Sequence, residues 1–313
     1  MYAYIVHRIL ATIPVMGVVG IAVFMLLHLT PGDPAAVIAG DYARPEDIAR
    51  IRAQLGLDRP LHVQFFTWVG SILAGDLGVS IFSDLPVAHL IGQRLEPTFA
   101  LAAATLVFSV VIAIPMGVLA AWKAGTWTDR IIMIFAVLGF SVPVFVIAYA
   151  LMWVFSLQLG WFPVQGYKSI FDGFGPFLHS IALPTVALGV IYVALMARIT
   201  RASMLETLQE DYIRTARAKG VDNRAVLIRH ALRNASVPIV TIIGIGIALL
   251  IGGGVVTESV FNIPGLGRLT IDAVLRRDYP VIQGVILVFS AAYVIVNLVI
   301  DLSYTVLDPR IRY

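Results

Sequence analysis

The chain has 313 residues, of which 59% are apolar and 13% are charged. A soluble globular domain carries about 25% charged residues, so this composition excludes an ordinary water-soluble globule and indicates a membrane protein. The net charge of +3 gives no indication of a nucleic-acid partner, and the absence of cysteine excludes disulfides, thiol catalysis and cysteine-based metal sites.

Six windows are long and apolar enough to cross the roughly 30 Å hydrocarbon core of a bilayer as helices. They contain no Asp, Glu, Lys or Arg, and His28 is their only histidine. The windows are residues 9–29, 98–122, 131–156, 180–197, 235–257 and 279–300. The first is too long for a typical signal peptide and no small-residue cleavage site follows it, so we interpret it as a retained helix. The sequence therefore predicts an all-α polytopic membrane protein with six transmembrane helices.

The segment 30–97 between the first two windows is expected to lie outside the membrane. Within it, Pro45 suits the first position of a short amphipathic helix, and Gly56 suits its end. A second stretch from Leu61 carries Phe65 and Trp68 on one stripe, and Trp68 suits the membrane interface. The pattern alone favours a cap lying on the bilayer surface, although a segment that receives solute from a partner remains the alternative.

The distribution of basic residues predicts the orientation. With a cytoplasmic N-terminus, the inner loops 123–130 and 198–234 hold ten Lys and Arg residues, whereas the short outer loops 157–179 and 258–278 hold four. Six spans then place both termini in the cytoplasm.

The densest basic cluster, residues 211–235, holds six Arg and Lys residues against two Asp. Asp211 suits an N-cap, and Gly220 suits the residue that follows the end of a helix of about eight residues. Asp222 or Asn223 can cap a second helix, on which Ala225, Ile228 and Leu232 share a face. We therefore expect two short helices joined at a glycine. Topology and contact with anionic lipid could explain the charges alone, whereas the small residues beside them favour close approach by a protein surface.

The residues show no means of using an energy source within this chain. No Gly-x4-Gly-Lys-Ser/Thr phosphate loop occurs, and no convincing catalytic or metal-binding set is found. A secondary transporter driven by protons or sodium usually keeps carboxylates or histidines at membrane depth. The nearly charge-free windows disfavour that alternative, and a scaffold or assembly factor also remains open.

The loop resembles the coupling loop of ABC importer permeases, which carries a Glu-Ala-Ala-x-x-x-Gly-x9-Ile-x-Leu-Pro pattern. Aligned on Gly220, the chain matches this pattern at Ala216 and Leu232. It departs from it at Arg214, Thr215, His230 and Arg233. The longer string "DYIRTARAKG…RHALRNA" is similar to the dipeptide, oligopeptide and nickel branch of the family, which departs in the same way.

Further motifs of this branch occur in order along the chain. They are "PGDP" (31–34), "LGLDRPLHVQF" (55–65), "GDLGVS" (75–80), "ESVFNIPGLG" (258–267), "DYPVIQG" (278–284) and "LDPRIRY" (307–313). The pattern resembles the first, B-type permease subunit, which has an external insertion after its first helix. The resemblance implies an ABC type I importer transmembrane fold, divided into residues 1–96 (first helix and insertion) and 97–313 (a five-helix core with the coupling loop 198–234).

The resemblance also implies partners, location and site residues. It implies a bacterial inner-membrane complex with a second permease, two ATPase subunits that use ATP and Mg²⁺, and an external solute-binding protein, while this chain binds no cofactor. The implied ATPase-coupling residues are Asp211, Arg214, Thr215, Ala216, Arg217, Ala218, Lys219, Gly220 and Leu232. The residues implied to lie near the outer gate are Glu258, Phe261, Pro264 and Gly265.

The solute is expected to be a short peptide, because the branch carries di- and oligopeptides. Glutathione, opines and nickel chelates are the alternatives. Stripping water from charged peptide termini is costly, so the charge-poor interior predicts a wide hydrated path with little selectivity of its own.

Overall fold

The computed structural model describes residues 2–29, 35–36, 44–54 and 56–307, and all regular elements in these residues are helices. Each hydrophobic window becomes helical, as predicted. The corresponding helices are α1 (Tyr2–Leu29), α5 (Val87–Trp122), α6 (Trp127–Ser141) with α7 (Val144–Leu151), α8 (Phe174–Leu208), α11 (Ser236–Gly253) and α14 (Tyr279–Leu307). Four of them are continuous spans, and counting two bent pairs as spans gives six. The motif at 31–34, and residues 308–313 of the motif at 307–313, lie outside the described residues.

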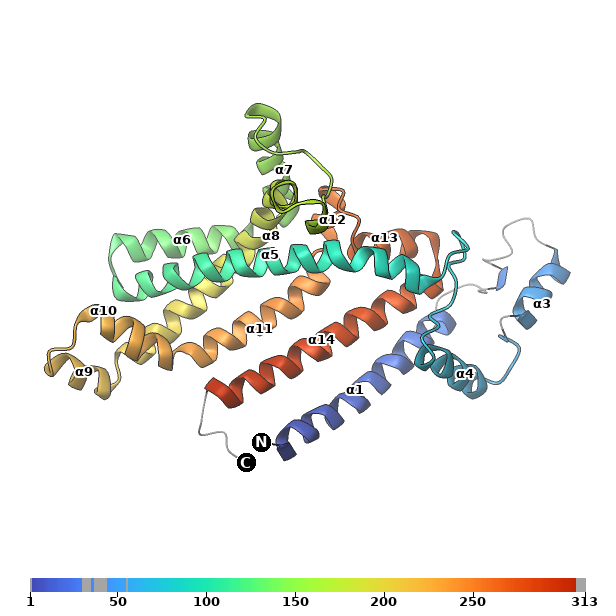
Figure 1. Cartoon of the computed structure of the whole chain (residues 1–313), viewed down its shortest axis with the longest axis horizontal. Helices are drawn as coiled ribbons and strands as arrows, with labels where there is room; N and C mark the ends of the chain where they lie inside the picture. The colour runs from blue at the N-terminus through green and yellow to red at the C-terminus, as the bar shows by residue number, and fades with distance from the viewer. Residues whose placement is uncertain (1, 30–34, 37–43, 55, 308–313) are drawn as a thin grey trace.

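The third window forms a bent pair of helices, which the hydropathy pattern did not predict. α6 ends at Ser141, α7 begins at Val144, and a π-helical segment η1 (Met152–Gln158) continues it at 103° to α6. Pro143 explains the break, because proline lacks an amide hydrogen and forces the preceding residue out of the helical conformation. Val142 is accordingly extended, with φ −87° and ψ 126°. In Figure 1, α7 projects away from the bundle.

The bundle is centred on α5 and α8, which pack closely near their C-terminal ends. A Cβ atom placed on Gly117 of α5 would lie 2.6 Å from Cβ of Thr200 and 2.7 Å from the carbonyl oxygen of Ala197, both on α8. Gly139 of α6 would meet Val190 of α8 at 3.1 Å. The small residues therefore allow backbones to approach within the bundle, as is common for membrane helices.

The two peripheral helices α1 and α14 lie side by side along one flank (Figure 1). Arg8 of α1 and Asp301 of α14 form an ion pair of 3.1 Å. At the other end of the pair, the side chain of Gln283 donates to the carbonyl of Val23 at 3.2 Å. These polar contacts fix α14 against α1 at both ends.

The external segment contains α3 (Pro45–Gln54) and α4 (Leu61–Leu73), and Pro45 is the first residue of α3, as predicted. Phe65 and Trp68 of α4 pack against Phe24 of α1, in an edge-to-face and a tilted arrangement, with ring centroids 5.3 and 5.7 Å apart. His28 contacts both the carbonyl of Phe24 and the side chain of Gln64. Trp68 is therefore half-buried against α1 instead of facing lipid alone, so α4 is attached to the outer end of the first span.

Candidate functional site

The basic segment forms a compact helical hairpin at one end of the bundle (Figure 1). It consists of α9 (Asp211–Ala218), α10 (Asn223–Ala225) and the π-helical segment η3 (Val226–Leu232). Gly220 has a φ of +78° and its amide donates to the carbonyl of Arg217, while the amide of Val221 donates to the carbonyl of Ala216. This pair of bonds is the Schellman motif, which requires a left-handed residue after the helix. Gly220 thus ends α9 as predicted.

The two helix starts differ in how they are capped. Asp222 caps α10 by accepting from the amide of Arg224 at 3.0 Å, as expected. The expected N-cap Asp211 is wrong, because Glu210 is the extended residue before α9 and Asp211 is the first helical residue. A carboxylate there still faces the positive end of the helix dipole, and it also pairs with Arg214 at 3.3 Å.

One face of the hairpin is anchored in a hydrophobic cluster. Ile213 of α9 is fully buried, and it shares the cluster with Met204 of α8, Ala121 of α5 and Val226 of η3. Leu232 and Ala216 are half-buried at the edge of the same cluster. The hairpin is therefore fixed to the C-terminal ends of α5 and α8.

The expected buried face of the second helix is only partly correct. Ile228 is 54% exposed, and the buried residues are Val226, Leu227 and Ala231. The cause is the π-helical form of η3, whose i→i+5 hydrogen bonds change the residue spacing on which the prediction depended. Ile213, Val226, Leu227 and Ala231 were not predicted as anchors, although Ile213 is the only aliphatic residue larger than alanine in α9.

The opposite face of α9 is open to solvent. Its exposed residues are Asp211, Tyr212, Arg214, Thr215, Arg217, Ala218, Lys219 and Gly220. Tyr212 is held by Asn234, whose amide donates to the phenol oxygen at 2.6 Å. The result is a short helix held on one side, with a basic and small-residue surface on the other. We call this surface the foot, defined by the exposed residues just given.

The residues expected near an outer gate gather at the other end of the bundle. Glu258 lies in α12 (Val255–Val260) and is 1% exposed. Its carboxylate accepts from the hydroxyl of Thr98 at 2.7 Å and from the amide of Arg268 at 3.0 Å. Thr98 in turn accepts from the amide of Leu266 at 2.8 Å. The buried carboxylate therefore ties α5, α12 and the N-terminus of α13 together.

The helix α13 (Leu266–Arg276) was not predicted, although Leu266, Leu269 and Ala273 recur at helical spacing and are buried. Gly265 is its N-cap and lies so close to the Glu258 carboxylate that no Cβ atom fits there. Phe261 is 2% exposed in the outer core cluster, whereas Pro264 is exposed. The structure thus brings the four expected residues into one neighbourhood, and their role as a gate stays a prediction.

The outer loop before α8 is fastened by a second carboxylate. Glu96 of α5 accepts from the hydroxyl of Tyr167 at 2.7 Å, the hydroxyl of Ser169 at 3.0 Å and the amide of Ile170 at 3.1 Å. Burial raises the pKa of the Tyr167 phenol above its ordinary value, and the hydrogen bond to Glu96 raises that pKa further. The phenol therefore stays a neutral donor, and the loop is attached to α5.

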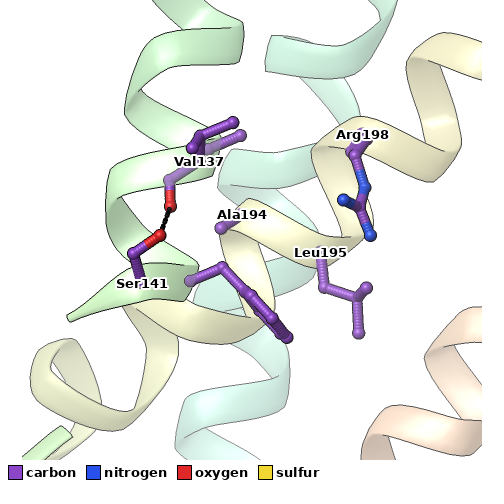
Figure 2. A pocket seen from close by; sticks show the side chains of 7 residues that line it. Val137, Ser141, Ala194, Leu195 and Arg198 are labelled. Atoms are coloured by element: carbon purple, nitrogen blue, oxygen red, sulfur yellow. Dashed lines mark hydrogen bonds between the residues drawn. The ribbon is translucent and has the colours of Figure 1, made fainter. Parts of the chain in front are cut away.

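The clefts between spanning helices differ in their polar groups, and one between α1 and α14 is lined by Arg8, Thr12, Asn297 and Asp301 among apolar side chains. Figure 2 shows a small cleft of ≈ 90 Å³ between α6 and α8, with Arg198 at its rim. The hydroxyl of Ser141 in this cleft donates to the carbonyl of Val137 in its own helix at 2.8 Å. Among the described residues, no group of three or more His, Asp or Glu side chains is placed to hold a metal ion.

Two family models match the chain. The model described as "Binding-protein-dependent transport system inner membrane component" matches residues 113–313, and its N-terminal companion matches residues 1–102. A relative from Sinorhizobium fredii, named probable peptide ABC transporter permease protein y4tP, is 54% identical over 100% of both chains. The glutathione transport system permease protein GsiC of Escherichia coli K12 is 45% identical, again over 100% of both.

Two solved structures show the same fold at low sequence identity. An inward-facing form of the MetNI methionine ABC transporter matches with a TM-score of 0.58 and 18% identity, covering 70% of this chain and 96% of that one. An amino acid ABC transporter matches with a TM-score of 0.50 and 15% identity, covering 71% and 94%. The expected all-α ABC permease fold is confirmed, and the ion-coupled and scaffold alternatives are excluded. The chain belongs to the binding-protein-dependent transport system inner membrane components and is a multi-pass permease subunit of an ABC importer in the bacterial inner membrane.

Proposed function

We propose that this permease imports short peptides and that the foot docks on an ATPase subunit. A second permease completes the translocation path, two ATPase subunits hydrolyse ATP with Mg²⁺, and an external binding protein delivers the solute. Both termini lie in the cytoplasm, on the side of the basic hairpin. Residues 1–96 and 97–313 act as the insertion-bearing and core parts, although α5 runs unbroken across their boundary.

The observation that carries this proposal is the one-sided anchoring of α9. An isolated eight-residue helix is marginal in water because helix nucleation is costly. Here the buried side chain of Ile213 holds α9 against α5 and α8. Movement of the exposed face of α9 is therefore transmitted to the spanning helices α5 and α8, which a flexible loop would not do.

Peptide is the preferred solute class because relatives named for peptide and for glutathione transport match along the whole chain. Glutathione is itself a small peptide, so it remains the second candidate. Mass spectrometry of ligands bound to the partner binding protein separates the two, since it identifies the solute directly. A non-peptide ligand, such as an opine or a metal chelate, would contradict the peptide assignment.

The docking role is tested by substitutions on the foot. We expect Ala218→Arg to assemble normally, because residue 218 is exposed. An unpaired charge buried at the docking surface costs about 3–5 kcal/mol, which corresponds to a ~100-fold or greater loss of docking affinity. ATP-dependent uptake in vesicles should then fall to background while the protein remains in the membrane.

The control Ala88→Arg introduces the same charge at an exposed position on α5, far from the foot.

A second pair of variants tests the turn at Gly220. Gly220→Pro removes a residue with φ +78°, whereas Gly220→Asn tolerates the left-handed region. Uptake should be lost in the proline variant and largely kept in the asparagine variant. Normal uptake in both Ala218→Arg and Gly220→Pro would refute the docking role.

A further inference from the structure

An ion pair between α6 and α8 lies outside the sites described above. Asp129, in the first turn of α6, is 4% exposed. Arg201 of α8 donates to both of its oxygens, from Nε to Oδ1 at 2.5 Å and from Nη2 to Oδ2 at 2.7 Å. The amide of Gly125, in the turn between α5 and α6, also donates to Oδ2 at 2.9 Å. One carboxylate thus joins the α5–α6 turn, the start of α6 and α8.

The pair lies next to the cluster that anchors the foot. Met204, three residues after Arg201 on α8, is fully buried and packs in the same cluster as Ile213 of α9. In Figure 1, the turn between α5 and α6 lies at the same end of the bundle as α9 and α10. Arg201 therefore stands about one helical turn from the residues that hold the foot.

At this end, α6 is held less firmly than α5 is. α5 is held against α8 by the close approach at Gly117 and shares the anchoring cluster through Ala121. In the first turn of α6, by contrast, Trp127 is 73% exposed and Arg130 lies over its ring at 5.5 Å. The Asp129 carboxylate is the polar connection between α6 and α8, and α6 leads directly to the bend at Pro143.

Fold stability alone does not account for such a pair. The Arg201 side chain is 27% exposed and that of Asp129 is 6% exposed, so the pair is partly buried and desolvation offsets part of its attraction. A bidentate Arg–carboxylate pair does fix relative orientation, since two parallel hydrogen bonds define the geometry. We propose that Asp129 and Arg201 are positioning residues for transport, forming a clamp through which movement of the foot reaches α6 and α7. This inference rests on the proposed docking of the foot.

The test compares removal of the clamp with removal of another ion pair in the assembled transporter. In Asp129→Asn/Arg201→Met, neither partner is left as an isolated buried charge, and asparagine can still accept from Gly125. We expect ATPase activity within about twofold of wild type. Uptake per ATP hydrolysed should be at least about fivefold lower, a change that corresponds to about 1 kcal/mol. The matched control Arg8→Gln/Asp301→Asn removes the pair between α1 and α14 and should leave this ratio unchanged.

A second readout follows movement directly. The chain has no cysteine, so Ile134→Cys on α6 and Ile245→Cys on α11, two exposed positions, are spin-labelled on this subunit alone before it is assembled with its partners. We expect their distance distribution to change on addition of ATP in the otherwise wild-type complex, and to change much less in the clamp double variant. An equal change in both would overturn the proposal, as would an unchanged uptake ratio.

If the double variant does not assemble, Arg201→Lys decides the matter. Lysine keeps the charge but loses the two-pronged geometry, so a lowered uptake ratio supports the clamp and a normal one refutes it. Failure of the clamp is distinguishable from failure of the docking proposal. Uncoupling by Ala218→Arg together with normal coupling in the clamp variants would reject the clamp alone, whereas normal coupling in both would reject docking as well.

Discussion

At the scale of single residues, buried and half-buried carboxylates act as fasteners in this permease. Glu258 holds the start of α13, and Glu96 holds the loop before α8. Asp278, 4% exposed, accepts from the hydroxyl of Ser80 at 2.6 Å and from the amide of Ile81 at 3.2 Å, which attaches the external segment to the start of α14. Each carboxylate connects segments that are far apart in the sequence, and so holds those segments together in the fold.

The Glu96 fastener predicts a loss of stability in alkali. The folded-state pKa of Tyr167 is raised above the unfolded value of about 10. Above that pH the unfolded state binds fewer protons than the folded state, so the contribution of the neutral phenol is complete below about pH 10 and is lost as pH rises toward the folded-state pKa.

Thermal unfolding of the purified protein at pH 8 and pH 11 should therefore show a larger decrease for wild type than for Tyr167→Phe, which lacks the titrating group. The phenylalanine variant should also be less stable at pH 8, by about 1–2 kcal/mol, because Glu96 loses a hydrogen bond. Parallel pH profiles would contradict this assignment.

Residue-level prediction from the sequence succeeded where backbone conformation restricts the choice of amino acid. Gly220 was identifiable because few other residues accept a left-handed conformation after a helix. Asp211 was placed one position wrongly, because local chemistry favours aspartate over glutamate as an N-cap, whereas α9 begins after Glu210 without a side-chain cap hydrogen bond. The partners of Glu258 were not predictable, since Thr98 is 160 residues away.

At the scale of elements, hydropathy found every span and missed the interruptions within them. A 26-residue apolar window does not reveal that Pro143 turns the chain by 103°, since many membrane helices contain proline without such a bend. The hydrophobic periodicity of the sequence likewise does not indicate the π-helical segments η1 and η3. The amphipathic α13 was recognisable from its spacing but was assigned to the loop 258–278, because it lies between two apolar windows.

The packing of α5 on α8 gives a prediction at this scale. Gly117→Ala places a Cβ within 2.7 Å of Thr200 and Ala197, and overpacking of this kind costs about 1–3 kcal/mol. Gly92→Ala, in the same helix, meets nothing within 4 Å and should be neutral or stabilising by about 0.5–1 kcal/mol. Thermal unfolding in detergent measures both. Equal midpoints for the two variants would show that α5 and α8 are not closely packed at Gly117.

At the scale of the whole molecule, the two ends of the bundle have different constructions. The foot end exposes a basic helical surface over a hydrophobic anchor, and the opposite end is tied together by buried carboxylates and the helices α4 and α13. Between them, the described clefts differ in polarity, and one between α1 and α14 includes Arg8 and Asp301 in its lining. One on α5, α6 and α8 is lined by nine side chains that are all apolar: Phe108, Ile112, Met116, Ile131, Ile132, Phe135, Val186, Val190 and Val193. Because the six apolar windows of the sequence contain no Asp, Glu, Lys or Arg, solute selection is expected to lie in the binding protein.

This expectation is tested on the purified permease complex without its binding protein. Titration calorimetry with dialanine should detect no binding tighter than about 0.1 mM, because charged peptide termini lose their water on entering such a path and gain few partners. The binding protein alone, titrated in the same buffer, serves as the positive control. A nanomolar site in the permease complex would contradict the prediction.

The bend at Pro143 has a consequence for the surrounding lipid. The 15 residues of α6 extend for about 22 Å, which is less than the hydrocarbon thickness of about 30 Å. Since α7 leaves α6 at 103°, it adds little to the length of α6 across the membrane. The length of α6 is therefore roughly 8 Å shorter than the hydrocarbon thickness beside it. On this flank, the bilayer has to thin or another protein surface has to cover the difference.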